Sequence, residues 1–313
     1  MRFPVNFELL KKNKARPGRR FQSRIIRVLG LLAMAGALQA CSVMKLAYNQ
    51  APDLAYWYLD GHLDLTGEQS LQVKASLNQL QDWHRQTQLP VYITALQQLQ
   101  QQIPSDTTAA AACAVTADVR GKLATVAHQA EPLAAGLAGM LQPDQLRHME
   151  QKFAKTNAEA LEEARDEAQD SSRNIRQGKR YKKALSRAQD LYGTLDETQR
   201  ALIARRLEQS RFDARRLFAE RQRRQHDTLQ TLQPLASIQT SPAQAQAALH
   251  GLVARTLRPP DPVMRSYLNA LSQENCQSFA ELHNSTTPAQ RGKALETLKR
   301  YEQDFRILNA QKS

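Results

Sequence analysis

Residues 65–103 read LTGEQSLQVKASLNQLQDWHRQTQLPVYITALQQLQQQI, and this stretch decides the fold. It begins with Thr66 and, three residues later, Gln69, which is the capping-box arrangement of a helix N-terminus. On both sides of Pro90, residues at spacings of four, three and four predict one face of a helix. They are Val73, Leu77, Leu80 and His84, and then Tyr92, Leu96, Leu99 and Ile103. Because proline lacks an amide proton and disfavours helix in the residue before it, we expect a bend at Pro90.

The chain beyond this stretch is also predicted to be helical. Gly and Pro are scarce, at 12 and 13 of 313 residues, and no strand-like alternation stands out. Further helices are expected from about Ala109, from Pro143 to Gly178, from Asp196 to Pro234, and over 242–256, 262–283 and 288–308. We therefore predict an all-α fold, with long antiparallel helices in an elongated helical bundle.

Three of these helix starts share the form Leu-x-x-x-Gln. They begin at Leu65, Leu141 and Leu195. Helix capping by itself makes such starts common, so capping is the preferred interpretation of the shared form.

Residues 41–64 precede the predicted helical domain, which covers residues 65–313, and form an aromatic-rich first helix. They contain Tyr48, Tyr56, Trp57 and Tyr58. We expect these rings to pack into the body of the domain. The alternative is contact with a membrane interface, where aromatic side chains are enriched.

Residues 1–40 have the layout of a lipoprotein signal peptide. A basic leader precedes an apolar core from Val28 to Leu38, and Leu38-Gln39-Ala40-Cys41 closes it as a lipobox does. The core has 11 residues, whereas a membrane-spanning helix needs about 20. Cleavage is therefore favoured over an uncleaved amphipathic anchor. We expect a lipid anchor on Cys41, and Ser42 favours the outer membrane, on the periplasmic face, of a Gram-negative bacterium.

The net charge of the whole chain gives a misleading indication of a nucleic-acid partner. The formal net charge is +13, but residues 1–40 hold nine of the 43 Lys and Arg residues and one of the 30 acidic residues. The remaining 273 residues therefore carry a net charge of +5. We expect a membrane contact through the lipid on Cys41 and no nucleic acid.

The cysteines carry a sharper prediction. The chain has three, and Cys41 is assigned to the lipid. Cys113 and Cys276 remain in a compartment that is oxidising, so we predict a disulfide between them. The alternative is a pair of buried thiols.

Two groups of residues are candidates for chemistry. Asp60, His62 and Asp64 form D-x-H-x-D, which offers ligands for a divalent metal, with His84 as a further ligand. Helix capping and turn hydrogen bonds explain these residues better, so no metal and no cofactor are predicted. His84 has no anchored carboxylate or nucleophile near it in sequence, so we predict a hinge in which it bonds to carbonyls freed by Pro90.

Residues 200–224 hold nine arginines, among them Arg205, Arg206, Arg215 and Arg216. Guanidinium groups suit the phosphates and carboxylates of an anionic envelope component, which makes these four a possible anion-binding set. The preferred alternative is a solvated face that pairs with the acidic segment 159–170.

A set of residues between 41 and 103 forms a motif. It consists of Tyr48, Asn49, Trp57, Asp60, Gln69, Trp83, His84, Arg85, Leu89, Pro90 and Tyr92. Together with the lipobox, this motif resembles the DUF6279 family of proteobacterial lipoproteins, over about residues 41–103. The resemblance implies a lipoprotein and supplies no catalytic residues.

Taken together, the sequence predicts a non-enzymatic envelope lipoprotein that binds a protein or an anionic component, as a chaperone or assembly factor does. The alternatives are an envelope hydrolase or metal-dependent enzyme using His62, Asp64 and His84, and a structural link to the envelope through the arginine-rich helix.

Overall fold

The computed structural model describes residues 42–236 and 240–311. The predicted signal peptide and Cys41 lie outside these residues. The chain divides into two compact units, Met1–Ala47 and Tyr48–Ser313. Residues 42–47, the described part of the first unit, form the start of helix α2 (Ser42–Asn49). The second unit contains the remaining elements.

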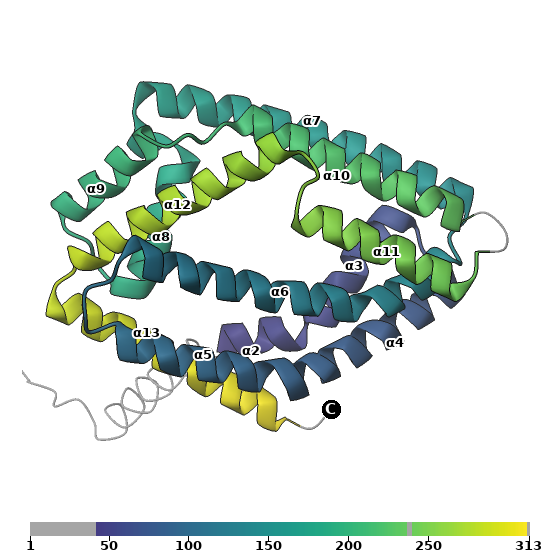
Figure 1. Cartoon of the computed structure of the whole chain (residues 1–313), viewed down its shortest axis with the longest axis horizontal. Coiled ribbons are helices and arrows are strands. Elements are labelled where there is room, and N and C mark those ends of the chain that lie inside the picture. The colour runs from purple at the N-terminus through teal and green to yellow at the C-terminus, as the bar shows by residue number, and fades with distance from the viewer. Residues whose placement is uncertain (1–41, 237–239, 312–313) are drawn as a thin grey trace, which may run out of the picture. The chain divides into compact units, whose positions relative to one another are not determined.

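The described residues of the second unit are helical, and the prediction of an all-α fold is confirmed (Figure 1). In chain order the helices after α2 are α3 (Ala51–Leu63), α4 (Gly67–Trp83), the π-helix η1 (His84–Gln88), α5 (Leu89–Gln102), α6 (Ala109–Ala138), α7 (Pro143–Arg173), the short 3-10 helix η2 (Ile175–Gln177), α8 (Lys179–Tyr192), α9 (Glu197–Glu208), α10 (Ala214–Leu235), α11 (Pro242–Leu257), α12 (Pro262–Asn284) and α13 (Pro288–Ala310).

The helices differ from the predictions at two places. The helix expected from Asp196 to Pro234 is divided into α9 and α10, because Asp213 begins a new helix. The Asp213 carboxylate accepts hydrogen bonds from the backbone amides of Arg215 and Arg216 at 2.8 and 3.4 Å, as an N-cap does. In addition, α8 occupies a stretch for which no helix was predicted.

Pro90 does not break the helix, although α4 and α5 run in different directions (Figure 1). Helix α4 continues through η1 into α5, and Pro90 lies in the first turn of α5. In η1 the amide of Leu89 donates to the carbonyl of His84, five residues earlier. The wider π turn shifts the hydrogen-bond pattern at the position where proline offers no donor, so the chain need not leave the helix.

The helices bury two apolar cores. Helix α5 packs along α13, α6 packs against α11 and α12, and α7 packs against α10. One core lies among α3, α6, α7, α10 and α11 and includes Leu63, Leu141 and Leu249. The other is built mainly from α8, α9, α12 and α13 and includes Tyr192, Leu195 and Leu298. Burial of these side chains is the main stabilising contribution to the fold.

At each core, a pair of glutamines joins the starts of two helices, and in the first core both glutamines are buried. Gln69 begins α4 as the third residue of its capping box, and Gln145 lies in the first turn of α7. Each amide nitrogen donates to the other's carbonyl oxygen, at 3.0 and 2.7 Å. The nitrogens also donate to the backbone carbonyls of Met140 and Asp64. The two helix N-termini are therefore fastened to each other by a reciprocal amide pair.

The second core has the same arrangement. Gln199 of α9 and Gln290 of α13 exchange amide hydrogen bonds at 2.8 and 2.9 Å, and each also donates to a backbone carbonyl beside the other helix. The shared Leu-x-x-x-Gln form therefore does more than cap. Its glutamine caps one helix and binds the start of another, and only tertiary contact supplies the partner.

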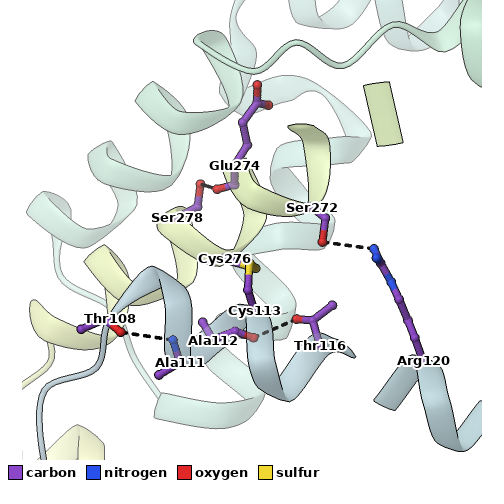
Figure 2. Close-up of a disulfide and its surroundings, with 10 residues drawn as sticks. All are labelled: Thr108, Ala111, Ala112, Cys113, Thr116, Arg120, Ser272, Glu274, Cys276 and Ser278. Atoms are coloured by element: carbon purple, nitrogen blue, oxygen red, sulfur yellow. Dashed lines mark hydrogen bonds between the residues drawn. A yellow bond between two sulfur atoms is a disulfide. The ribbon is translucent and has the colours of Figure 1, made fainter. Parts of the chain in front are cut away.

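The disulfide prediction agrees with the structure. Cys113 of α6 and Cys276 of α12 are bonded, with their Cα atoms 5.3 Å apart (Figure 2). Beside the bond, Thr108 caps the start of α6, and Arg120 donates a hydrogen bond to Ser272 across the same two helices at 3.1 Å. The bond closes a loop of 163 residues and fixes α6 against α12.

The aromatic residues of α3 differ in their contacts and exposure. Tyr56 donates a hydrogen bond to Ser70 at 3.1 Å and lies under the Lys74 ammonium. Trp57 and Tyr58 are 63% and 64% exposed, so the expectation that they pack into the domain was wrong for these two. Among the helices that the structure describes, none is both long and apolar enough to cross a membrane.

Candidate functional site

An apolar groove opens between α5 and α6. Because α5 packs on α13 while α6 packs on α12 and α11, these two consecutive helices face each other across a space that no other helix fills in the described part of the chain. We call it the α5–α6 groove. Its first half, of about 390 Å³, is lined mainly by Tyr92, Ala95, Leu96, Leu99, Val115, Val119, Leu123 and Phe305. Its second half, of about 350 Å³, continues from Leu99 and Val115 and is lined by Ile103, Ala112, Leu191, Phe279, Leu298 and Cys276, among others.

The wall formed by α6 is an exposed apolar stripe. Val115, Val119 and Leu123 are spaced by four residues and so lie on one face of the helix. Val119 is 49% exposed and Leu123 is 60% exposed. Asp118 and Lys122 form an ion pair on the rim of the groove beside this stripe. An apolar strip with a polar rim is typical of a surface that binds another molecule.

A hydrogen-bonded cluster of family-motif residues lies at one end of the groove. Tyr92 lines the groove, and its hydroxyl is 3.3 Å from His84 Nε2. The other ring nitrogen of His84, Nδ1, is 3.0 Å from the Tyr48 hydroxyl. A neutral imidazole has one donor and one acceptor nitrogen, so one tyrosine donates to His84 and the other accepts. His84 belongs to η1, and π-helical turns are frequent at functional sites.

Burial sets the protonation states of this cluster. It lowers the pKa of His84 below 6.5, which favours the neutral ring. It also raises the pKa of Tyr48 to about 12, in spite of the opposing effect of Arg85, and raises that of Tyr92. At neutral pH all three side chains are uncharged, so the cluster orders the end of the groove without placing a charge there.

Two other motif residues lie beside the cluster, where the Arg85 guanidinium donates to Asn49 at 3.4 Å. Gln81, which is not part of the motif, donates to the Tyr48 carbonyl at 2.6 Å. Trp83 is only half-buried. The predicted role of His84, bonding to carbonyls freed by Pro90, was wrong, because both ring nitrogens face tyrosine hydroxyls.

Four further motif residues lie outside this cluster. Leu89 is 1% exposed in the start of α5, and Gln69 forms the amide pair described above. Asp60 accepts a hydrogen bond from the Leu65 amide at 3.2 Å, where α3 ends. Trp57 is exposed.

A second buried histidine closes the other half of the groove. His283 is 2% exposed, and its Nε2 donates to the Ser105 carbonyl at 2.8 Å. Its Nδ1 therefore accepts from the Tyr192 hydroxyl, also at 2.8 Å. Burial raises the pKa of Tyr192, so its hydroxyl keeps its proton at neutral pH. Both ring nitrogens are engaged, and His283 has no lone pair left for chemistry.

The structure does not bring together the residues of the alternative metal site. His62 Nδ1 bonds to the Tyr58 carbonyl at 2.8 Å, and Asp64 is the C-cap of α3 in a left-handed conformation. His84 is occupied by the two tyrosines. Among the described residues, these three are not part of a metal-sized cluster.

The arginine-rich segment pairs mainly within the protein. Arg206 of α9 binds Glu281 of α12, and Arg216 lies 3.6 Å from Asp213 and over the Tyr267 ring. Arg205 and Arg215 are exposed on different helices. Among the side chains that the structure describes, the acidic partners of these arginines come mainly from α10 and α12, for example Glu220, Glu274 and Glu281.

Glu220 shows the strength of this pairing. It is 5% exposed, and it accepts hydrogen bonds from Arg223 and Arg224 at 2.7 to 3.0 Å. Burial raises the pKa of Glu220, but the hydrogen bonds and charges of the two arginines outweigh burial and hold the pKa below 4.5.

One cluster was missed by the sequence analysis. His128 and Glu131 of α6 meet His250 of α11, which is far away in the sequence. The spacing His-x-x-Glu on one helix was the available signal, but only tertiary structure supplies the third residue.

The fold and the site define the class of this protein: it is all-α, with a long-range disulfide and an open apolar groove. The chain belongs to the DUF6279 family, described as a family of unknown function, whose model matches residues 61–256. The match covers more than half of the chain, including α4 to α10. It begins after four of the quoted motif residues and extends far beyond residue 103. No curated protein matches, and no solved structure matches.

Proposed function

We propose that this protein is a non-enzymatic, lipid-anchored envelope factor that binds an apolar helical segment of another envelope protein in the α5–α6 groove. The observation that carries the proposal is the groove itself. It is walled mainly by α5 and α6, with α12 and α13 contributing, is lined mostly by aliphatic and aromatic side chains, and is open to solvent at Val119 and Leu123.

The form of the groove favours a helix as the occupant. Helix-binding grooves are flanked by helices whose apolar residues recur at i and i+4, so that they match an amphipathic partner. Val115, Val119 and Leu123 have this spacing, and Leu96, Leu99 and Ile103 face them from the other side. Gln98 and Gln102 lie on the α5 side and Asp118 and Lys122 on the α6 side, so polar groups of the partner would find hydrogen-bonding groups at the rim.

Anchoring rests on the sequence. The short apolar core followed by Leu38-Gln39-Ala40-Cys41 supports acylation of Cys41 and location at the periplasmic face of the outer membrane. Globomycin should then accumulate an unprocessed precursor, and Cys41→Ser should abolish labelling by a palmitate analogue. If the protein with its native Cys41 never takes up the label, the anchor is absent.

The groove is tested by photocrosslinking in intact cells. A benzophenone amino acid at Val119 or Leu123 should give a discrete crosslinked protein partner. The matched control is Leu71, which is 74% exposed on α4 and does not line the groove. Crosslinks of equal yield at all three positions would mean that the groove has no special role.

A binding assay identifies the occupant. A fluorescent model amphipathic helix of leucine, glutamate and lysine should bind the purified protein, and Val119→Asp with Leu123→Asp should weaken binding at least tenfold. Both side chains are exposed, so the fold should be kept, and Leu71→Asp should bind normally. If dansyl-undecanoate binds in the groove and the peptide does not, the occupant is an acyl chain and the helix proposal is wrong.

A further inference from the structure

A three-residue cluster joins α6 to α11 outside the groove. The Glu131 carboxylate lies between two imidazoles, with Oε1 2.6 Å from His128 Nδ1 and Oε2 3.0 Å from His250 Nδ1. The two histidine rings are 5.3 Å apart between centroids. One ligand atom from each of the three residues lies within 4.8 Å of the others.

These separations are close to those of a metal site. Zinc binds imidazole nitrogen and carboxylate oxygen at about 2.0–2.2 Å, so two ligand atoms in a tetrahedral site are about 3.3 Å apart. The present separations of 2.6 and 3.0 Å are slightly shorter. An outward movement of each imidazole by less than about 1 Å would therefore admit an ion.

The exposure of the three side chains suits metal binding. The Glu131 side chain is 6% exposed, whereas the side chains of His128 and His250 are 43% and 63% exposed. The carboxylate is therefore held in place while both imidazoles face solvent and can rotate. An ion can reach the cluster from solvent, and a water molecule can complete its coordination.

The buried carboxylate is paired by the two histidines. Among the described residues, the ion-pair partners of Glu131 are His128 and His250. A buried carboxylate is costly unless it is paired, and a divalent cation pairs it more strongly than two titratable rings do.

We infer that His128, Glu131 and His250 form a binding site for a divalent transition-metal ion of the Zn²⁺ type. Two imidazoles and one carboxylate are a donor set that zinc uses in proteins, with a further position left for water. Since α6 packs along α11, the bound ion would fasten these two helices together. The site is separate from the α5–α6 groove, whose lining does not include these residues.

Zinc titration of the purified metal-free protein tests the inference. Isothermal calorimetry should find one Zn²⁺ per chain with a dissociation constant in the micromolar range or below. Co²⁺ should give the intense visible absorption of a tetrahedral site, and Zn²⁺ should displace it. Zn²⁺ should also raise the melting temperature, because an ion that binds only the folded state stabilises it.

Variants separate this site from adventitious binding. His128→Ala, His250→Ala and Glu131→Gln should each weaken Zn²⁺ binding at least tenfold and remove the Co²⁺ absorption. His226→Ala, which removes an exposed histidine of α10 outside the cluster, should change neither. Each alanine variant leaves the other imidazole on Glu131, so the metal-free variants should stay folded, which circular dichroism checks. The inference is wrong if no Zn²⁺ binds, or if the alanine variants bind it as tightly as the native protein.

Discussion

The amide pair of Gln199 and Gln290 gives the sharpest test of how this fold is held together. Gln199 is 1% exposed and makes four hydrogen bonds through its side chain. It donates to Ser285 O and Gln290 Oε1 at 3.0 and 2.8 Å, and it accepts from the amides of Asp196 and Gln290 at 3.1 and 2.9 Å. Gln199→Ala removes all four.

The magnitude follows from the groups left behind. A polar group left buried without a partner costs about 1–3 kcal/mol. Gln199→Ala leaves the Ser285 carbonyl and the Asp196 amide without these partners, whereas the Gln290 amide keeps its bonds to Thr194 and Thr287. Both orphaned groups are only partly buried, so we use the lower end of the range and expect a loss of about 2 kcal/mol in the free energy of unfolding.

A double-mutant cycle in urea measures the pair itself. Gln290→Ala should destabilise by a similar amount, and the double variant should cost about 1–2 kcal/mol less than the sum, because each single variant already removes both hydrogen bonds that the pair exchanges. Gln244→Ala is the matched control, since Gln244 completes the capping box of α11 without an amide partner, and it should cost about 1 kcal/mol or less. Additive effects of Gln199→Ala and Gln290→Ala, or a loss no larger than that of Gln244→Ala, would refute the reasoning.

Three further outcomes are expected. Cys113→Ser with Cys276→Ser should lower the free energy of unfolding by about 2–5 kcal/mol, and mass spectrometry of unreduced protein should find the two cysteines joined; free alkylation of both in native protein would contradict the bond. The pKa of Glu220 lies below 4.5 in the folded state, so its contribution to the free energy of unfolding is present above pH 4.5 and is lost as the pH falls through the folded pKa. The stability difference between the native protein and Glu220→Gln should therefore shrink in acid, and a difference independent of pH would be inconsistent with the pairing. Tyr48→Phe should lower the free energy of unfolding by about 1 kcal/mol, because it removes one hydrogen bond to His84. An NMR titration should place the pKa of His84 below 6.5. A His84 that titrates at or above 6.5 would show that its ring is not desolvated.

The sequence by itself determined the class of fold and most helix ends. These depend on local chemistry, namely capping side chains, proline in first turns and apolar spacing along one face, and such signals lie within a few residues of each other. Thr66 and Gln69 form the capping box that the sequence predicts, and Pro143, Pro242, Pro262 and Pro288 each begin a helix as expected. The cysteine pair could be predicted because, once Cys41 was assigned to the lipid, two cysteines remained.

Tertiary structure alone decided which residues meet. The π turn at His84 keeps α4 and α5 continuous through Pro90, and the hydroxyls of Tyr48 and Tyr92 meet the His84 ring there. The groove exists because α5 and α6 pack on different neighbours, which no local pattern records. The same holds for the partners of Gln69 and Gln199 and for the meeting of Glu131 with His250, since 119 residues separate the last two and nothing in their sequence spacing indicates contact.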